Sequence, residues 1–199
     1  MEVFPMNTVT TLAPATWQVD PVHSHVEFAV RHLMISTVKG RFAEVAGTLA
    51  GDDSDPEHAS IELTIAASSL DTHEPQRDGH LRSADFFEVD RYPEIRFRST
   101  RIAKQGDGTF LVHGTLTIRG VTKPVTVAVL PGGRGRDMQG AERVGYSAIT
   151  RISRKDFGLT WNQILETGGV AVGDEVTISV ELQLVRASSV EDVGKRIKR

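Results

Sequence analysis

The stretch VHSHVEFAVRH (residues 22–32) alternates between apolar and polar side chains along most of its length. One face carries Val22, Ser24, Val26, Phe28, Val30 and His32, and the other carries His23, His25, Glu27, Ala29 and Arg31. Because successive side chains of a β-strand point to opposite faces, this pattern predicts a strand with one buried face. The same pattern recurs through the chain, and this recurrence decides the fold class.

Alternation with a period of two returns in segments 61–67, 94–102, 110–118, 125–129, 144–152 and 176–184. A less regular segment at 38–50 and a short opening segment at 17–20 bring the expected number of strands to about eight. Turn signals such as Gly106-Asp107-Gly108 separate neighbouring segments, as is typical of hairpins. The Gly-rich stretch 131–143 is predicted to be a loop. The sequence therefore predicts an all-β, antiparallel fold.

Residues 71–92 interrupt the β pattern with helix-forming side chains. Thr72 is a candidate N-cap, and Pro75 follows three residues later, where a first helical turn tolerates proline. Phe86 and Phe87 are expected to anchor this segment to the sheet. We expect one or two short helices here, and a second irregular stretch at 153–174.

Strands with one apolar face must bury that face, either between two packed sheets or inside one sheet that closes on itself. Eight strands is about the size at which a closed barrel is filled by side chains or holds one small ligand. Few aromatic residues fall on the expected inner face, which favours space inside. We expect one barrel domain at 16–187, with a flexible leader at 1–15 and a disordered basic tail at 188–199.

Composition excludes several classes of function. A net charge of −3 argues against nucleic-acid binding, which needs concentrated positive charge. The absence of cysteine excludes disulfides, thiol chemistry and Cys-ligated zinc. No segment reaches the roughly 18–20 apolar residues that span a bilayer, so no stable membrane insertion is expected. The N-terminal residues lack the pattern of a signal peptide, and we therefore expect a soluble, cytoplasmic protein.

No motif indicates catalysis, a cofactor or a metal. His23 and His25 could share a metal from one strand face, but no third ligand stands nearby. Gly132-Gly133-Arg134-Gly135 lacks the Lys-Ser/Thr and the helix of a phosphate loop, and no serine nucleophile elbow is present. Two polar features remain: His32 at the end of an apolar face, and Arg154 among the basic residues near 151–155. Either could orient the polar end of a ligand, or simply cap a loop.

Five ordered segments resemble the signatures of the YceI-like family. They are VDPVHSHVEFAVRHLMISTVKGRF (19–42), SLDTHEPQRDGHLRSADFFEVDRYPEIRF (69–97), GTLTIRGVTKPVTV (114–127), ITRISRKDFGLTWN (149–162) and VGDEVTISVELQLV (172–185). The resemblance covers roughly residues 17–186.

This resemblance implies an extended, lipocalin-like antiparallel β-barrel with a short helical insertion, whose lumen holds a long isoprenoid or other lipid. Members are often periplasmic, some are linked to stress or acid tolerance, and none has an established enzymatic activity. The resemblance also suggests a homodimer. It leads us to expect non-catalytic binding, storage or transport of a polyisoprenoid, a quinone tail or a similar lipid.

We assign the expected ligand contacts from the first family signature and from the alternation. The expected lumen wall comprises Val26, Phe28, Val30, Ile61, Leu63, Ile65, Phe97, Leu116, Tyr146 and Trp161, and His32 and Arg154 are the candidates for a head group. Two alternatives stay open at this stage. One is an enzyme that acts on a lipid or a small hydrophobic substrate with His32 as general base. The other is a packed barrel whose outer surface binds a protein partner.

Overall fold

The fold is taken from a computed structural model, which describes residues 15–52, 55–164 and 169–187. The expected leader, apart from Ala15, and the expected basic tail lie outside these residues. The strands are β1 (Ala15–Val19), β2 (His25–His32), β3 (Ser36–Phe42), β4 (Val45–Asp52), β5 (Asp55–Ala66), β6 (Leu70–Asp71), β7 (Glu94–Lys104), β8 (Phe110–Ile118), β9 (Val121–Arg136), β10 (Glu142–Ser153) and β11 (Val172–Arg186). One α-helix, α1 (Pro75–Arg82), and two short 3₁₀ segments, Ala67–Ser69 and Arg154–Phe157, complete the described elements.

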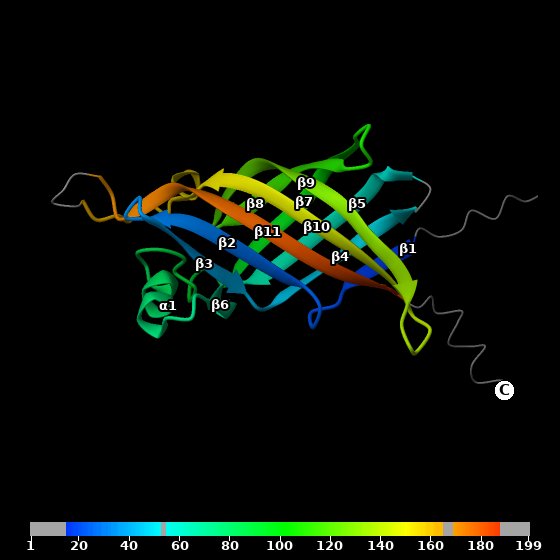
Figure 1. The fold of residues 1–199 in the computed structure, drawn as a ribbon, viewed down its shortest axis with the longest axis horizontal. Coiled ribbons are helices and arrows are strands. Elements are labelled where there is room, and N and C mark those ends of the chain that lie inside the picture. The colour runs from blue at the N-terminus through cyan, green and yellow to red at the C-terminus, as the bar shows by residue number, and fades with distance from the viewer. Residues whose placement is uncertain (1–14, 53–54, 165–168, 188–199) are drawn as a thin grey trace, which may run out of the picture.

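The strands form a closed antiparallel barrel (Figure 1). Its order is β1-β4-β5-β7-β8-β9-β10-β11, and pairing of β1 with β11 closes the ring. Strand β2 also pairs with β11, and β3 and β6 follow from it, so these three strands extend the wall at one end. The predicted antiparallel barrel of about eight strands is confirmed.

The first predicted strand begins later than the alternation suggests. Residues 20–24 form a turn between β1 and β2, and Val22 is 83% exposed rather than on a buried face. The Asp20 carboxylate accepts a hydrogen bond from the Val22 backbone N–H at 3.0 Å, a local bond that competes with the sheet ladder. Ser24 then rejoins the wall, because its hydroxyl accepts from Gln183 N at 3.0 Å.

Two further boundaries differ from the sequence prediction. The single strand expected at 38–50 is divided into β3 and β4, and residues 43–44 lie between them. The predicted loop at 131–143 is largely strand, because β9 continues to Arg136 and β10 starts at Glu142. A β-bulge at the register shift between Val144 and Tyr146 accommodates the glycines of β9 in the sheet. Because glycine has no side chain, the sequence of this segment shows no alternation of apolar and polar residues.

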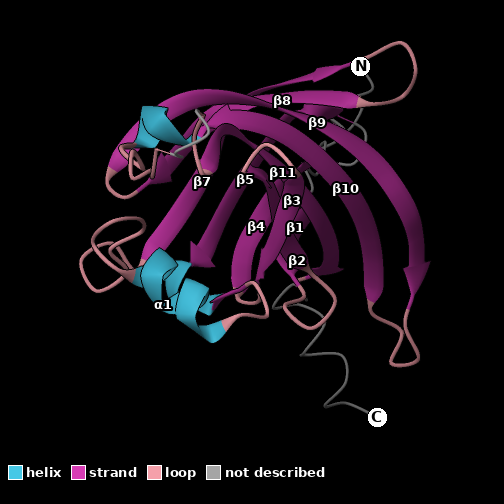
Figure 2. Ribbon diagram, turned by 60° about the vertical axis from the view of Figure 1, so that its left-hand side comes forward, coloured by secondary structure: helices cyan, strands magenta, loops and turns pink. Residues whose placement is uncertain are grey.

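One helix, α1, forms within the predicted helical segment and lies at one end of the barrel (Figure 2). Its N-cap is Glu74 rather than Thr72, because the Glu74 carboxylate accepts from the backbone N–H groups of Gln76 and Arg77. Thr72 instead donates both its backbone N–H and its hydroxyl to Asp78, at 3.0 and 2.5 Å. This buried pair fixes the helix against the short strand β6 that precedes it.

Candidate ligand-binding cavity

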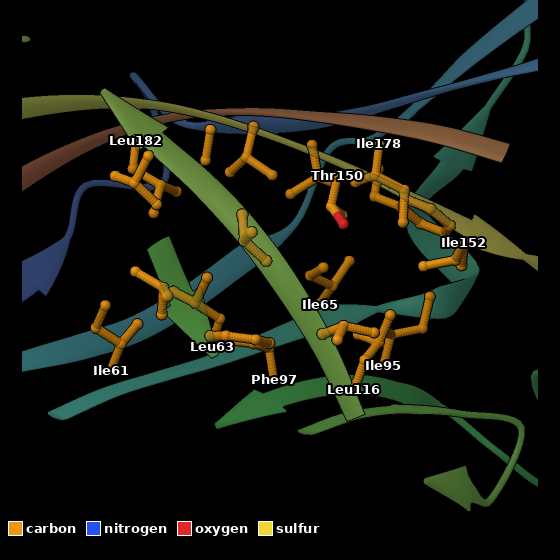
Figure 3. A pocket seen from close by; sticks show the side chains of 18 of the residues that line it. Ile61, Leu63, Ile65, Ile95, Phe97, Leu116, Thr150, Ile152, Ile178 and Leu182 are labelled. Carbon is orange, nitrogen blue, oxygen red and sulfur yellow. The ribbon is translucent and has the colours of Figure 1, made fainter. Parts of the chain in front are cut away.

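The inner face of the barrel encloses a cavity of about 430 Å³. Strands β2 to β5 and β7 to β11 all contribute side chains to its wall. Figure 3 shows the labelled side chains converging on one space, and the Thr150 hydroxyl is the only labelled polar group. A volume of this size lies in the range of small-molecule pockets, about 300–1,000 Å³. The barrel is therefore hollow, and its interior is not filled by side chains.

Ten of the twelve residues expected at a ligand site line this cavity. They are Val26, Phe28, Val30, Ile61, Leu63, Ile65, Phe97, Leu116, Tyr146 and Arg154. Nine of the ten lie on strands, where alternation alone selects the inner face. Their contact with a ligand stays a prediction.

His32 lies outside the set of lining residues, although it follows Val30 on the same face of β2. It pairs with Val172, and the register of β11 shifts between Val172 and Val176. Val172 lines the cavity, so the cavity wall reaches the level of His32 although His32 is not part of it. The alternation alone cannot show this, because the register shift lies in the neighbouring strand.

Trp161 also lies outside the lining residues. It belongs to no strand and packs against the α1 segment, with ring centroids 4.7 Å from His80 and 5.4 Å from Phe86. Phe86 and its neighbour Phe87 themselves reach the cavity, together with Leu81 of α1. These contacts cover the α1 end of the cavity with aromatic and apolar side chains.

Two groups can be distinguished among the cavity residues that the sequence analysis did not select. Val125, Val127, Val129, Ile178 and Val180 extend the alternating faces, so the period-two signal was present. Phe42, Leu81, Phe86 and Phe87 depend on where β3 ends and where α1 packs. No local sequence signal identifies the second group as cavity wall.

Two glycines make room for aromatic rings inside the barrel. Gly40 is the cross-strand partner of Phe28, and a Cβ atom at Gly40 would overlap the Phe28 ring. A Cβ atom at Gly114 would lie 2.7 Å from the ring of Phe97. Each ring thus lies against a glycine of the neighbouring strand, in space that a Cβ atom would occupy.

Polar groups are scarce in the described cavity wall. Apart from Arg154, its polar side chains are Thr48, Tyr146 and Thr150, and the Thr150 hydroxyl donates to Thr126 O at 2.8 Å. The described wall contains no Asp, Glu, His or Lys. Among the described residues, no group of three or more His, Asp or Glu side chains could hold a metal.

Arg154 is 3% exposed, and its guanidinium is held by main-chain carbonyls. Its Nε donates to Gly173 O at 2.8 Å, Nη1 to Leu159 O and Trp161 O at 2.5 and 2.9 Å, and Nη2 to Val172 O at 3.2 Å. Nη2 also reaches the Asp174 carboxylate at 3.4 Å, so all five N–H donors have acceptors in the protein. Burial lowers the pKa of Arg154, and the Asp174 charge opposes that shift.

A family model for the YceI-like domain matches residues 17–184. The chain belongs to the YceI-like family. The resemblance inferred from the five sequence segments is thus confirmed. The UPF0312 protein of Serratia proteamaculans (strain 568) is 39% identical to this YceI-like chain over 159 residues, 80% of each protein.

Solved structures share the barrel of this YceI-like chain. The crystal structure of Burkholderia cenocepacia BcnA matches with a TM-score of 0.73 and 25% identity, over 83% of this chain and 98% of that chain. A polyisoprenoid binding domain from Saccharophagus degradans, implicated in plant cell wall breakdown, matches with a TM-score of 0.61 and 17% identity, over 86% and 98% of the two chains. The lipocalin-like barrel predicted from the resemblance is confirmed. Within the described residues, no helix is long and apolar enough to cross a membrane.

Proposed function

We propose that this YceI-like protein binds a long apolar chain in its barrel, and stores or transports it without chemical change. The ligand class is a polyisoprenoid, a quinone tail or a similar lipid. The observation that carries the proposal is the cavity of about 430 Å³ with its almost entirely apolar wall. The shared fold of a polyisoprenoid binding domain supports the same ligand class.

The energetics of burial favour a chain over a compact ligand. Each buried CH₂ group contributes about 0.8 kcal/mol, so affinity rises with chain length until the cavity is full. A ligand whose polar groups are distributed along its length would lose water inside the barrel and find few partners there. The cavity wall therefore selects for apolar length rather than for a particular functional group.

The wall also supports a non-catalytic role. General acid–base catalysis needs a titratable side chain within reach of the reacting atoms. The described wall contains no Asp, Glu, His or Lys, so its titratable side chains are Tyr146 and Arg154, and the donors of Arg154 are all engaged. The rival hypothesis, an enzyme with His32 as base, predicts a product when the protein is incubated with candidate lipids and no product with His32→Ala.

The experiment that tests the proposal is solvent extraction of the native protein followed by mass spectrometry. A stoichiometric isoprenoid or fatty-chain lipid, absent from an unrelated protein, is expected. A matched pair of variants ties the ligand to the cavity: Ala148→Trp projects into the cavity, and Ala128→Trp lies on the exposed outer face of β9. We expect loss of the lipid from Ala148→Trp alone. Equal lipid content in both variants, with both folded by circular dichroism, contradicts binding in the barrel.

Three further expectations stay predictions of the proposal. Residues 16–187 should fold without the flanking segments, which truncation tests. A cytoplasmic location is checked by cell fractionation, and a homodimer by light scattering of the purified protein.

A further inference from the structure

The proposed function leaves the polar end of the ligand without a binding site inside the barrel. Thr150 already donates to a backbone carbonyl, and Arg154 has acceptors for all of its N–H donors. Arg154 follows β10 directly, whereas the β9–β10 hairpin lies at the end of the barrel opposite α1 (Figure 1). The inference below rests on the proposed function and concerns that opposite end.

At this end the inner face changes from apolar to charged. On β11, Leu182 and Leu184 line the cavity, and the next inward position is Arg186. On β10, Tyr146 lines the cavity, and the same face continues to Glu142. The charged side chains thus extend the face that forms the cavity wall.

Strand β9 adds two more cations to the same face. Pro131 lines the cavity opposite Tyr146. Beyond the bulge, Arg134 pairs with Val144 and Arg136 pairs with Glu142. Because a strand rises about 3.4 Å per residue, Val144 and its partner Arg134 lie about 7 Å beyond the level of Tyr146 along the strand.

Arg134 and Arg186 lie over the same aromatic ring, and one carboxylate joins them to Arg136. The guanidinium carbons of Arg134 and Arg186 lie 5.2 and 6.0 Å from the ring centroid of Trp17, whose own exposure is 1%. The Glu142 carboxylate contacts all three guanidinium groups, at 3.9 Å from Arg134, 3.0 Å from Arg136 and 2.7 Å from Arg186. We call Arg134, Arg136, Arg186 and Glu142 the rim cluster.

Within the rim cluster, the guanidinium groups of Arg136 and Arg186 exceed the one Glu142 carboxylate by one positive charge. A hydrogen bond from Arg186 lowers the pKa of Glu142, so this carboxylate is ionised at neutral pH. The side chains of Arg136 and Arg186 are 70% and 47% exposed, which leaves them accessible to a solute. Among the described acidic residues, Asp20 and Asp137 pair with Arg143.

We propose that the rim cluster binds an anionic head group, a phosphate ester or a carboxylate, of a ligand whose apolar chain occupies the cavity. Arginine suits this role because its planar fork pairs with both oxyanions in a bidentate geometry. The Trp17 ring holds the guanidinium groups of Arg134 and Arg186 in place before the ligand binds. The Glu142 carboxylate competes with the head group for these guanidinium groups, and this competition sets the affinity for the head group.

The test compares probes that share one chain and differ at the head: geranylgeranyl phosphate, geranylgeranoic acid and neutral geranylgeraniol. Binding of each is measured by calorimetry on the full chain. Arg136→Gln removes a cation that does not stack on Trp17, and Arg98→Gln is the matched control. Arg98 is 71% exposed and pairs with Glu62 at 2.9 Å, on the opposite face of β7 from the cavity residue Phe97. We expect Arg136→Gln to weaken both anionic probes about tenfold, and geranylgeraniol by less than twofold.

Glu142→Gln provides a gain of affinity that a purely structural cluster does not predict. Loss of the competing carboxylate should strengthen binding of the anionic probes several-fold and leave geranylgeraniol unchanged. A preference for the carboxylic acid or for the phosphate then identifies the head group. If Arg136→Gln and Arg98→Gln weaken all three probes equally, the rim proposal is wrong while the cavity proposal stands. If no probe binds the wild-type protein, both proposals fail.

Discussion

At the scale of single residues, we expect Arg154 to stabilise the fold through its hydrogen bonds to main-chain carbonyls. Replacement by methionine should destabilise the fold by about 3–5 kcal/mol, because four buried or part-buried carbonyls each lose a hydrogen bond from the guanidinium. Urea unfolding measures this change. Arg151→Met is the control, since Arg151 is 68% exposed and lies 3.9 Å from an equally exposed Glu175. A stable Arg154→Met protein with weakened phosphate binding would instead support Arg154 as a head-group residue.

Asp20 should make the free energy of unfolding depend on pH in the acidic range. The hydrogen bond from Arg143 lowers the pKa of Asp20 from 3.8 to about 2, against the opposing effect of burial. A carboxyl group with a lowered folded-state pKa stabilises the fold above its unfolded value and loses that contribution as pH falls. We therefore expect the free energy of unfolding to fall between about pH 4 and pH 2.

Substitution tests this assignment directly. Asp20→Asn should be less stable at pH 6 and show a flatter decline below pH 4, as followed by urea unfolding at each pH. Glu62→Gln, which breaks an exposed ion pair on the outer face of β5, is the control and should keep the wild-type profile. If Asp20→Asn shows the same dependence of unfolding free energy on pH as the wild type, Asp20 does not contribute to the loss of stability in acid.

At the scale of elements, the pairing of β5 with β7 is shorter than either strand. Their pairing covers only 62–66 and 94–98, although β5 begins at Asp55 and β7 continues to Lys104. Beyond the paired part, Ile61 N donates to the Ser99 hydroxyl at 2.9 Å and Lys104 N to the Glu57 carboxylate at 3.0 Å. Side chains, rather than a backbone ladder, thus bridge the two strands there.

The part of β5 and β7 beyond their paired residues should open more readily than the paired part. Hydrogen exchange measured by NMR should be faster at Ile61 than in the paired part of β5, and Ser99→Ala should accelerate it further. Thr100→Ala removes a neighbouring hydroxyl that bonds to His113 O of β8, so it should leave Ile61 exchange unchanged. Equal exchange in both variants would show that Ser99 does not hold β5 and β7 together there.

At the scale of the whole molecule, ligand binding and stability are linked. A ligand that binds only the folded barrel stabilises it by about 2.7 kcal/mol at a hundredfold excess over Kd. For a domain of this size, that corresponds to a rise in Tm of about 5–10 °C. Calorimetry with geranylgeraniol should show this rise for the wild type and for Ala128→Trp, and little change for Ala148→Trp. A similar rise in all three proteins would place binding outside the barrel.

Alternation in the amino-acid sequence predicted the antiparallel strands and most of the inner face, and the resemblance to the YceI-like family predicted their closure into a barrel. Ile61, Leu63 and Phe97 were selected by alternation, Val26 and Phe28 were selected from the first family signature, and all five line the cavity. The reason is that the two faces of a strand follow from a local period of two, which each segment carries by itself. The short helix was predicted for a similar reason, although its N-cap was wrong.

Tertiary structure alone decided how long the cavity is and what covers its ends. Trp161 packs on His80 and Phe86, and His32 lies beyond a register shift, neither of which a local pattern records. The rim cluster likewise joins residues of β9, β10 and β11 around Trp17 of β1, through pairings between segments far apart in the chain. Strand register and barrel closure are long-range properties, so the sequence determined the wall, and the folded barrel determined where that wall ends.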